Sequence, residues 1–286
     1  MAYKIITDSC CDFKNEQYEN LNLTMIPLTV EFRGEATKDR NDDSLKVMYD
    51  AMRAGESAKT SAANPQQWSE VIEPVLAQGL DALVMTFSSG LSTTYQSAVI
   101  AAQELMEKYP ERKVTVCDTL CASLGQGLLV WYACKKRDEG YSLDELAAWV
   151  EENKLHLCHW FTVDDLMYLK RGGRISAATA LVGTMLQIKP VLHMDDAGHL
   201  ISVSKARGRK ASVEALAKKV AELGGNYENE TMFISHGDCL ADAQYLANIL
   251  KTTYGVKEVF INYVGAVIGS HSGPGTLALF FLGDHR

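Results

Sequence analysis

ALVMTFSSGLSTTYQSAVIAAQELMEKYPERKVTVC, residues 82–117, contains two strand-like runs with one helix-like run between them. Ala82–Phe87 is continuously apolar but too short for a helix, and Ser88-Ser89-Gly90 ends the run. Thr94–Tyr109 is rich in Ala, Gln, Leu, Met and Glu, which favour helices, and Lys113–Cys117 returns to a strand pattern. Strands separated by helices of this length predict a mainly parallel sheet that is covered on both faces.

The same alternation continues on both sides of this stretch. Further strands are predicted at Tyr3–Thr7 and Met25–Phe32. Helices are predicted at Leu45–Ala54, Trp68–Gln78, Gly127–Arg137 and Ser142–Asn153. We therefore expect an α/β protein in which residues 1–155 form an N-terminal three-layer α/β/α domain around a parallel sheet.

The second half has a different pattern. Lys189–Met194 and Leu200–Ala206 are strand-like and are joined by Asp195-Asp196-Ala197-Gly198, a link typical of a hairpin. Other strands are predicted at His156–Thr162, Met232–His236, Glu258–Tyr263 and Val267–Leu282. Helices are predicted at Asp164–Lys170, Ala177–Leu186, Lys210–Leu223 and Ala241–Tyr254. Residues 156–286 are therefore expected to form a C-terminal two-layer domain with a mixed sheet and helices.

Composition and charge narrow the classes of function. The length of 286 residues favours two domains, and the net charge of −8 without a large basic face argues against nucleic acid as a partner. The seven cysteines contain no C-x-x-C pair, so neither a disulfide framework nor a zinc cluster is predicted. The apolar runs are far shorter than the ~18 residues of a membrane span, and the first residues lack a signal-peptide pattern. A cytoplasmic location is expected.

Polar residues follow three of the predicted strands, at Thr7-Asp8-Ser9, Ser88–Ser92 and Asp118-Thr119. Ligands of open parallel sheets bind outside the carboxyl ends of the strands. Ser88–Ser92 also opens a helix, whose first N–H groups favour an anion, while Gly90 permits a close turn and Ser92 adds a hydroxyl donor. The same residues also fit a plain helix cap, which stabilises a fold by about 1 kcal/mol.

Two further segments carry candidate ligand groups. Thr60-Ser61 precedes Asn64-Pro65, a helix start, and capping explains this pair equally well. Gly269–Gly275 (GSHSGPG) holds His271 at a strand end or turn, where the imidazole either donates to an acidic ligand or satisfies nearby backbone groups. The chain has no G-x-S-x-G elbow, Walker A loop or H-E-x-x-H pair, so hydrolase, nucleotide and zinc-protease sites are not indicated.

Six short motifs occur in order along nearly the whole chain. They are Ile6-Thr7-Asp8-Ser9, Lys59-Thr60-Ser61, Ser88-Ser89-Gly90-Leu91-Ser92-x-Thr94-Tyr95, Leu169-x-x-Gly172-Gly173-Arg174-Ile175-Ser176, Lys205-Ala206-Arg207 and Gly269-x-His271-x-Gly273-Pro274-Gly275. In this combination the chain resembles the DegV family of bacterial fatty-acid-binding proteins, which includes the acyl-carrying subunits of fatty-acid kinase. The resemblance implies a non-catalytic carrier that buries one long-chain fatty acid in a tunnel between the two domains, with no other cofactor and no metal.

The resemblance also implies roles for particular residues. The carboxylate-binding positions that it implies are Thr60, Ser61, Gly90, Ser92 and His271. Arg174 and Arg207 resemble family arginines near the head group that are tied to a separate kinase subunit, which would phosphorylate the bound acid, and transient contact with a membrane is part of the same expectation. The chain departs from the family where Ala62-Ala63 replaces Gln-Pro and where Thr93 replaces glycine, so the geometry of the head-group site is the feature most affected.

Two other readings remain open. In one, the protein is an enzyme for acyl esters or small acids with Ser92 as nucleophile and His271 as base. Turnover without a partner would reveal it. In the other, the protein is an interaction or regulatory protein whose lipid is structural, and failure of acyl exchange would distinguish it.

Overall fold

The computed structural model describes residues 2–39, 44–176 and 187–286, so the helix expected at 177–186 lies outside the described residues. Within these ranges the N-terminal half contains a four-stranded parallel sheet in the order β2-β1-β6-β7. Its strands are β1 (Tyr3–Asp8), β2 (Thr24–Ile26), β6 (Asp81–Thr86) and β7 (Val114–Asp118). The stretch 82–117 therefore forms a strand, a covering helix and a neighbouring parallel strand, as predicted.

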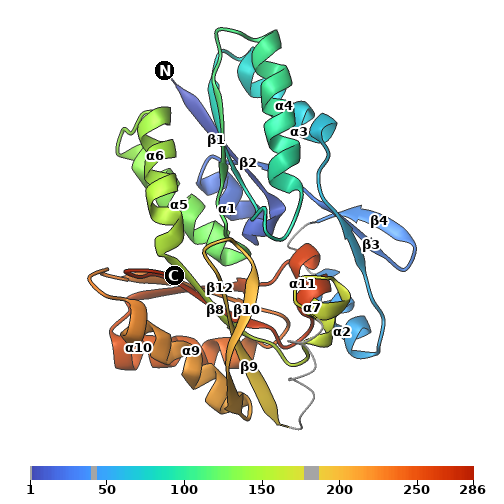
Figure 1. Cartoon of the computed structure of the whole chain (residues 1–286), viewed down its shortest axis with the longest axis vertical. Coiled ribbons are helices and arrows are strands. Elements are labelled where there is room, and N and C mark those ends of the chain that lie inside the picture. The colour runs from blue at the N-terminus through green and yellow to red at the C-terminus, as the bar shows by residue number, and fades with distance from the viewer. Residues whose placement is uncertain (1, 40–43, 177–186) are drawn as a thin grey trace.

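Helices cover both faces of the parallel sheet (Figure 1). They are α3 (Pro65–Ala77), α4 (Thr94–Lys108), α5 (Leu124–Asp138) and α6 (Leu143–Asn153), and the short elements η1 (Ser9–Cys11) and α1 (Asn15–Asn20) follow β1. Helices α3 and α4 share a core with Ile6 and Val84, whereas α5 and α6 share another with Ile5 and Leu83. Successive strand residues point to opposite faces, so continuous apolar runs are what a sheet covered on both sides requires.

The C-terminal half contains a six-stranded sheet in the order β10-β9-β8-β13-β11-β12. Among the described strands of this sheet, β11 and β12 pair in parallel and all other neighbours pair antiparallel. After η2 (Lys154–His156), its elements are β8 (Leu157–Thr162), α7 (Met167–Arg171), β9 (Ile188–Met194), β10 (Leu200–Arg207), α9 (Arg209–Leu223), β11 (Thr231–His236), α10 (Leu240–Tyr254), β12 (Glu258–Tyr263), α11 (Ala266–Ser272) and β13 (Leu277–Leu282). All strands of the parallel sheet precede β8, but the domain boundary expected at 155/156 remains a prediction.

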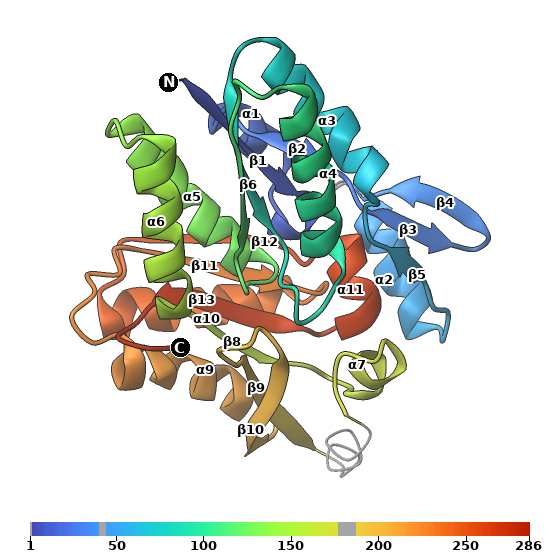
Figure 2. The ribbon, with the colours of Figure 1, turned by 45° about the horizontal axis from the view of Figure 1, so that its top comes forward.

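The mixed sheet has helices on one face and the N-terminal half on the other (Figure 2). Leu279 and Phe281 pack into a core with α9 and α10. Phe280, which lies between them on β13, points the other way into a core with α5. One face of the sheet is therefore available to line a space between the two halves.

A small third sheet was not predicted. It consists of β3 (Thr29–Phe32), β4 (Glu35–Lys38) and β5 (Lys59–Ser61), all antiparallel, and α2 (Ser44–Arg53) comes between β4 and β5. The single strand expected over Met25–Phe32 is split at Pro27, which has no N–H to donate to a sheet. Thr60-Ser61 was interpreted as a possible helix cap but belongs to β5, and Asn64 caps α3 by accepting from Gln67 N–H at 2.9 Å.

The strand expected over Val267–Leu282 is wrong in its first part, because Ala266–Ser272 is the helix α11. The buried Asp39 carboxylate lies near the start of this helix, where the backbone N–H groups of Ala266 and Val267 favour its charged form. Gly269 faces Tyr49 so closely that a Cβ there would lie 2.3 Å from the tyrosine hydroxyl. Both contacts come from remote segments, so they override the local preference of the β-branched residues for a strand.

Candidate functional site

A cavity of about 440 Å³ lies where the loops after β6 and β7 meet the mixed sheet. Its volume is within the range of about 300–1,000 Å³ that is usual for ligand pockets. Most of the wall is apolar and includes Phe87, Phe161, Leu200 and Phe280. The cavity lies at the carboxyl ends of parallel strands. Of the three polar clusters expected there, Ser88–Ser92 contributes to its wall, whereas Thr7-Asp8-Ser9 and Asp118-Thr119 do not.

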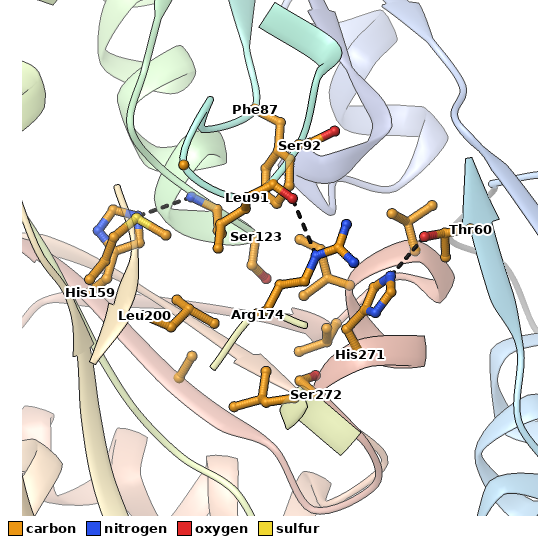
Figure 3. A pocket seen from close by; sticks show the side chains of 18 of the residues that line it. Thr60, Phe87, Leu91, Ser92, Ser123, His159, Arg174, Leu200, His271 and Ser272 are labelled. Atoms are coloured by element: carbon orange, nitrogen blue, oxygen red, sulfur yellow. Dashed lines mark hydrogen bonds between the residues drawn. The ribbon is translucent and has the colours of Figure 1, made fainter. Parts of the chain in front are cut away.

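One end of the cavity is polar. Thr60 on β5 and His271 on α11 both line it, and Thr60 Oγ1 lies 2.7 Å from His271 Nε2, within hydrogen-bonding distance (Figure 3). The small sheet brings Thr60 to this position, and the buried Asp39 lies near the start of the helix that carries His271. We call this hydrogen-bonded couple the Thr60–His271 pair.

His271 is neutral at neutral pH. Burial, together with the nearby positive charge of Arg174, lowers the pKa of its imidazole to about 4. The ring rests against Gly172, where a Cβ would lie 2.2 Å from His271 Nδ1. The missing side chain at Gly172 therefore makes room for the imidazole in the position where it meets Thr60.

The loop after β6 supplies the other predicted head-group residues. Ser92 Oγ lies 2.8 Å from Thr94 Oγ1 and accepts the Thr94 backbone N–H at 3.3 Å. Gly90 packs against the β9–β10 hairpin, since a Cβ there would lie 2.6 Å from the carbonyl oxygen of Gly198. Ser92, Gly90 and the exposed Ser61 all line the same cavity as the Thr60–His271 pair.

This arrangement does not provide the dyad that a Ser92/His271 enzyme would use. Among the hydrogen bonds of the described residues, Ser92 bonds to Thr94 and His271 bonds to Thr60. A serine nucleophile needs a hydrogen bond to its base. The geometry therefore favours a binding role for these two side chains.

The two predicted arginines lie in different places. Arg174 is half-buried in the cavity wall, where its Nε donates to the Leu91 carbonyl oxygen at 3.2 Å and its Nη1 donates to that of Gly172. No carboxylate of the described residues lies within ion-pair distance of its guanidinium. Arg207, at the end of β10, is exposed and is not among the residues that line the cavity.

Two absences concern the described ranges of the chain. There, no group of three or more His, Cys, Asp or Glu side chains is placed to hold a metal ion. No helix in the same ranges is long and apolar enough to cross a membrane.

Comparison with known proteins identifies the family of this chain. The profile described as "Uncharacterised protein, DegV family" matches residues 2–284. The chain belongs to the DegV family. A DegV domain-containing protein of Clostridium perfringens is 44% identical over 99% of this chain and 98% of its own length. One from Lactococcus lactis is 36% identical over 98% of this chain and 97% of its own length.

Solved DegV structures share the two-domain α/β fold predicted from the sequence. A DegV protein from Thermus thermophilus, described as binding fatty acid, is 31% identical, with 99% of this chain and 100% of that one covered and a TM-score of 0.88. A Thermotoga maritima protein whose structure is described as revealing a fatty acid binding function is also 31% identical, with 99% of each chain covered and a TM-score of 0.84. The Streptococcus pneumoniae fatty acid kinase B3 protein, loaded with linoleic acid, has the same fold at 24% identity, with 99% of this chain and 100% of that one covered and a TM-score of 0.85.

The cavity of this DegV protein also contains polar residues that the sequence analysis missed. His159 is buried with both ring nitrogens engaged, because Nδ1 lies 2.9 Å from the Leu157 carbonyl oxygen and Nε2 accepts the Ala122 N–H at 3.3 Å. Burial lowers the pKa of His159 well below its usual value, so the ring is neutral. No motif marks this histidine, which occurs in an ordinary strand pattern.

Ser123 is a second missed residue. It lines the cavity with φ 56° and ψ −147°, directly before α5, and is one of the non-glycine residues with positive φ. Such a backbone conformation costs about 1–3 kcal/mol in a residue other than glycine and is concentrated at functional sites. Nothing in the local sequence indicates this strained backbone.

Proposed function

We propose that this DegV protein binds one long-chain fatty acid in the 440 Å³ cavity, with the acyl tail among apolar side chains and the carboxylate at the Thr60–His271 pair. The observation that carries the proposal is the distribution of side chains in this cavity, whose apolar walls lead to one end with hydroxyls, an imidazole and a guanidinium. The fatty-acid-binding descriptions of the Thermus and Thermotoga relatives support the same ligand class.

The acyl tail supplies most of the affinity. Burying one methylene contributes about 0.8 kcal/mol, so about fourteen of them contribute roughly 11 kcal/mol before the costs of association. These contacts discriminate poorly between acids and neutral lipids, because both carry the same tail. The polar end of the cavity must therefore select the acid.

The head group needs hydrogen bonds because a buried carboxylate without them is strongly destabilising. The proposed donors are Thr60, Ser92 and His271, with Ser61 and the Gly90 segment beside them. Arg174 adds a half-buried positive charge that no carboxylate of the described residues neutralises. A fatty-acid carboxylate would complete this charge pair.

Transfer to a kinase is the next part of the proposal. The protein would present the carboxylate to a separate fatty-acid kinase subunit, which would form the acyl phosphate, and the kinase would contact Arg174 and Arg207. The exposed position of Arg207 suits contact with another protein. A cytoplasmic location, transient membrane contact and a domain boundary at 155/156 belong to the same proposal.

Native mass spectrometry of the freshly purified protein tests the ligand. The expected result is a stoichiometric fatty acid that is released only on denaturation and is identified after solvent extraction. His271→Ala should reduce the bound fraction, while His285→Ala, a change of an exposed histidine outside the cavity wall, should not. A protein that carries no lipid and takes up neither C16 nor C18 acid would refute the proposal.

A further inference from the structure

One buried hydroxyl in the cavity wall has no hydrogen-bond partner. Ser272 is the last residue of α11, is 4% exposed and lines the cavity. Its Oγ forms no hydrogen bond with the described residues, and no other lining residue in those ranges has a buried side-chain oxygen or nitrogen without a partner. Leaving a buried hydroxyl unpaired destabilises a protein, so the position of Ser272 suits a ligand atom that would supply the missing bond.

The other hydroxyls at the polar end of the cavity are already engaged. Thr60 Oγ1 lies 2.7 Å from His271 Nε2, and Ser92 Oγ lies 2.8 Å from Thr94 Oγ1. Each couple shares one proton between its two heavy atoms, so at most one proton of each couple remains for a ligand. An ionised carboxylate accepts hydrogen bonds on both oxygens, at about four lone-pair sites. A buried carboxylate therefore needs more donors than these two couples supply.

The charge of the wall also suits an acid. In the described ranges the cavity wall contains no Asp, Glu or Lys, and Arg174 is its one charged residue. Figure 3 shows Ser272 below Arg174 and farther from Thr60 than the His271 ring is. Because Cα atoms of consecutive residues are only about 3.8 Å apart, one head group can meet both His271 and Ser272.

We propose that Ser272 donates a hydrogen bond to one oxygen of the fatty-acid carboxylate while the Thr60–His271 pair holds the other oxygen. This inference rests on the proposed function, because it takes the ligand to be a fatty acid with its carboxylate at this end of the cavity. A primary alcohol of the same chain length has a single oxygen and would leave Ser272 unpaired. Ser272 is therefore a residue that selects acids over alcohols, since a site built for a polar group rejects an analogue that lacks it.

The unpaired hydroxyl gives this role an unusual signature. Ser272→Ala removes a group that has no partner in the lipid-free protein, so the melting temperature of that protein should stay the same or rise. Affinity for hexadecanoic acid should fall about tenfold, because the carboxylate loses a donor. A serine with a purely structural role would show the reverse, a lower melting temperature with unchanged selectivity.

Equilibrium competition against a fluorescent fatty acid, with hexadecanoic acid and hexadecan-1-ol as competitors, tests the inference. The wild type should bind the acid more tightly than the alcohol, and Ser272→Ala should lose about tenfold in affinity for the acid only. Thr276→Val is the matched control, because the Thr276 hydroxyl lines the same cavity but already donates to the Gly273 carbonyl oxygen at 2.7 Å. This control should lower the melting temperature and keep the preference for the acid. Ser272→Cys, which keeps the size of the side chain but donates weakly, serves as a second variant and should also lose the preference.

The outcomes separate this inference from the function on which it rests. If Ser272→Ala and Ser272→Cys keep the wild-type affinity for the acid, or weaken acid and alcohol equally, the inference is wrong and the carrier function stands. A clearly lower melting temperature of lipid-free Ser272→Ala would also overturn it, because the hydroxyl would then have a partner within the protein. If the wild type binds neither the acid nor the alcohol, the proposed function itself fails.

Discussion

Replacing Gly172 by alanine would change the position of His271 without touching the ligand. The added Cβ would lie 2.2 Å from His271 Nδ1, whereas real Cβ contacts essentially never fall below 3.0 Å. The backbone at Gly172 has φ −73° and ψ −11°, which alanine adopts readily. The strain therefore falls on the imidazole, which must move by close to an ångström.

A shift of that size would break the hydrogen bond of 2.7 Å between the Thr60 hydroxyl and His271 Nε2 and misplace the imidazole for a carboxylate. A hydrogen bond to a charged group is worth about 1.5–3 kcal/mol, and 1.4 kcal/mol is a factor of ten in affinity. We therefore expect Gly172→Ala to weaken binding of hexadecanoic acid about 10- to 100-fold. The melting temperature should change little, because the clash is relieved by one partly exposed side chain.

Equilibrium competition against a fluorescent fatty acid measures this change. Gly79→Ala is the control for a general loss of stability, since it adds a methyl group in open space away from the cavity but at φ +78°, where alanine is strained. In a His271→Ala background, Gly172→Ala should have almost no further effect, because the ring that it displaces is gone. Wild-type affinity in the single Gly172→Ala variant, or an equal loss in the double variant, would refute the reasoning.

Three other predictions use different parts of the structure. Gly90→Ala places a Cβ 2.6 Å from the carbonyl oxygen of Gly198, a backbone atom that cannot move aside as a flexible side chain can. We therefore expect urea unfolding to show a free energy of unfolding that is lower by about 1–3 kcal/mol. An unchanged midpoint would contradict the close packing. The pKa of His271 is about 4 in the folded protein and 6.5 in the free side chain, so the unfolded chain binds more protons between these pH values. As the pH drops from 7 to 4, the free energy of unfolding of the wild type should therefore fall by up to about 3 kcal/mol relative to that of His271→Asn. Parallel pH curves for the two proteins would show that the imidazole is not desolvated. Arg174→Ala should lower both fatty-acid binding and kinase-dependent phosphorylation. Arg207→Ala should slow phosphorylation severalfold and leave fatty-acid binding unchanged. If the two changes weaken binding equally, Arg207 contributes to the cavity after all.

The main architecture could be predicted because it depends on local patterns. The run at Ala82–Phe87 and the helix after it contain enough apolar residues to be recognised without any knowledge of their partners. The small sheet could not be recognised, because β4 is exposed along its whole length and its residues show no apolar alternation. The helix α11 could not be recognised either, since Asp39 and Tyr49, which lie against it, belong to another part of the chain.

The candidate site was predictable only in part for the same reason. Thr60, Ser92 and His271 belong to motifs, so the family resemblance predicts them as site residues. In the structure these three residues line one cavity. Ser123 carries no motif, and its position in the cavity wall depends on a positive backbone φ that cannot be deduced from residue types.

The hydrogen bond between Thr60 and His271 spans 211 residues of the chain, which has a consequence for synthesis on the ribosome. At about 5–20 residues per second, roughly 10–40 s separate the appearance of the two partners. During that interval the N-terminal half has been made, but the proposed fatty-acid site lacks its histidine and much of the wall formed by the last strands. In the proposed function, loading of the ligand would therefore follow translation, and until then the apolar lining of the unfinished cavity is a surface that chaperones would have to protect from aggregation.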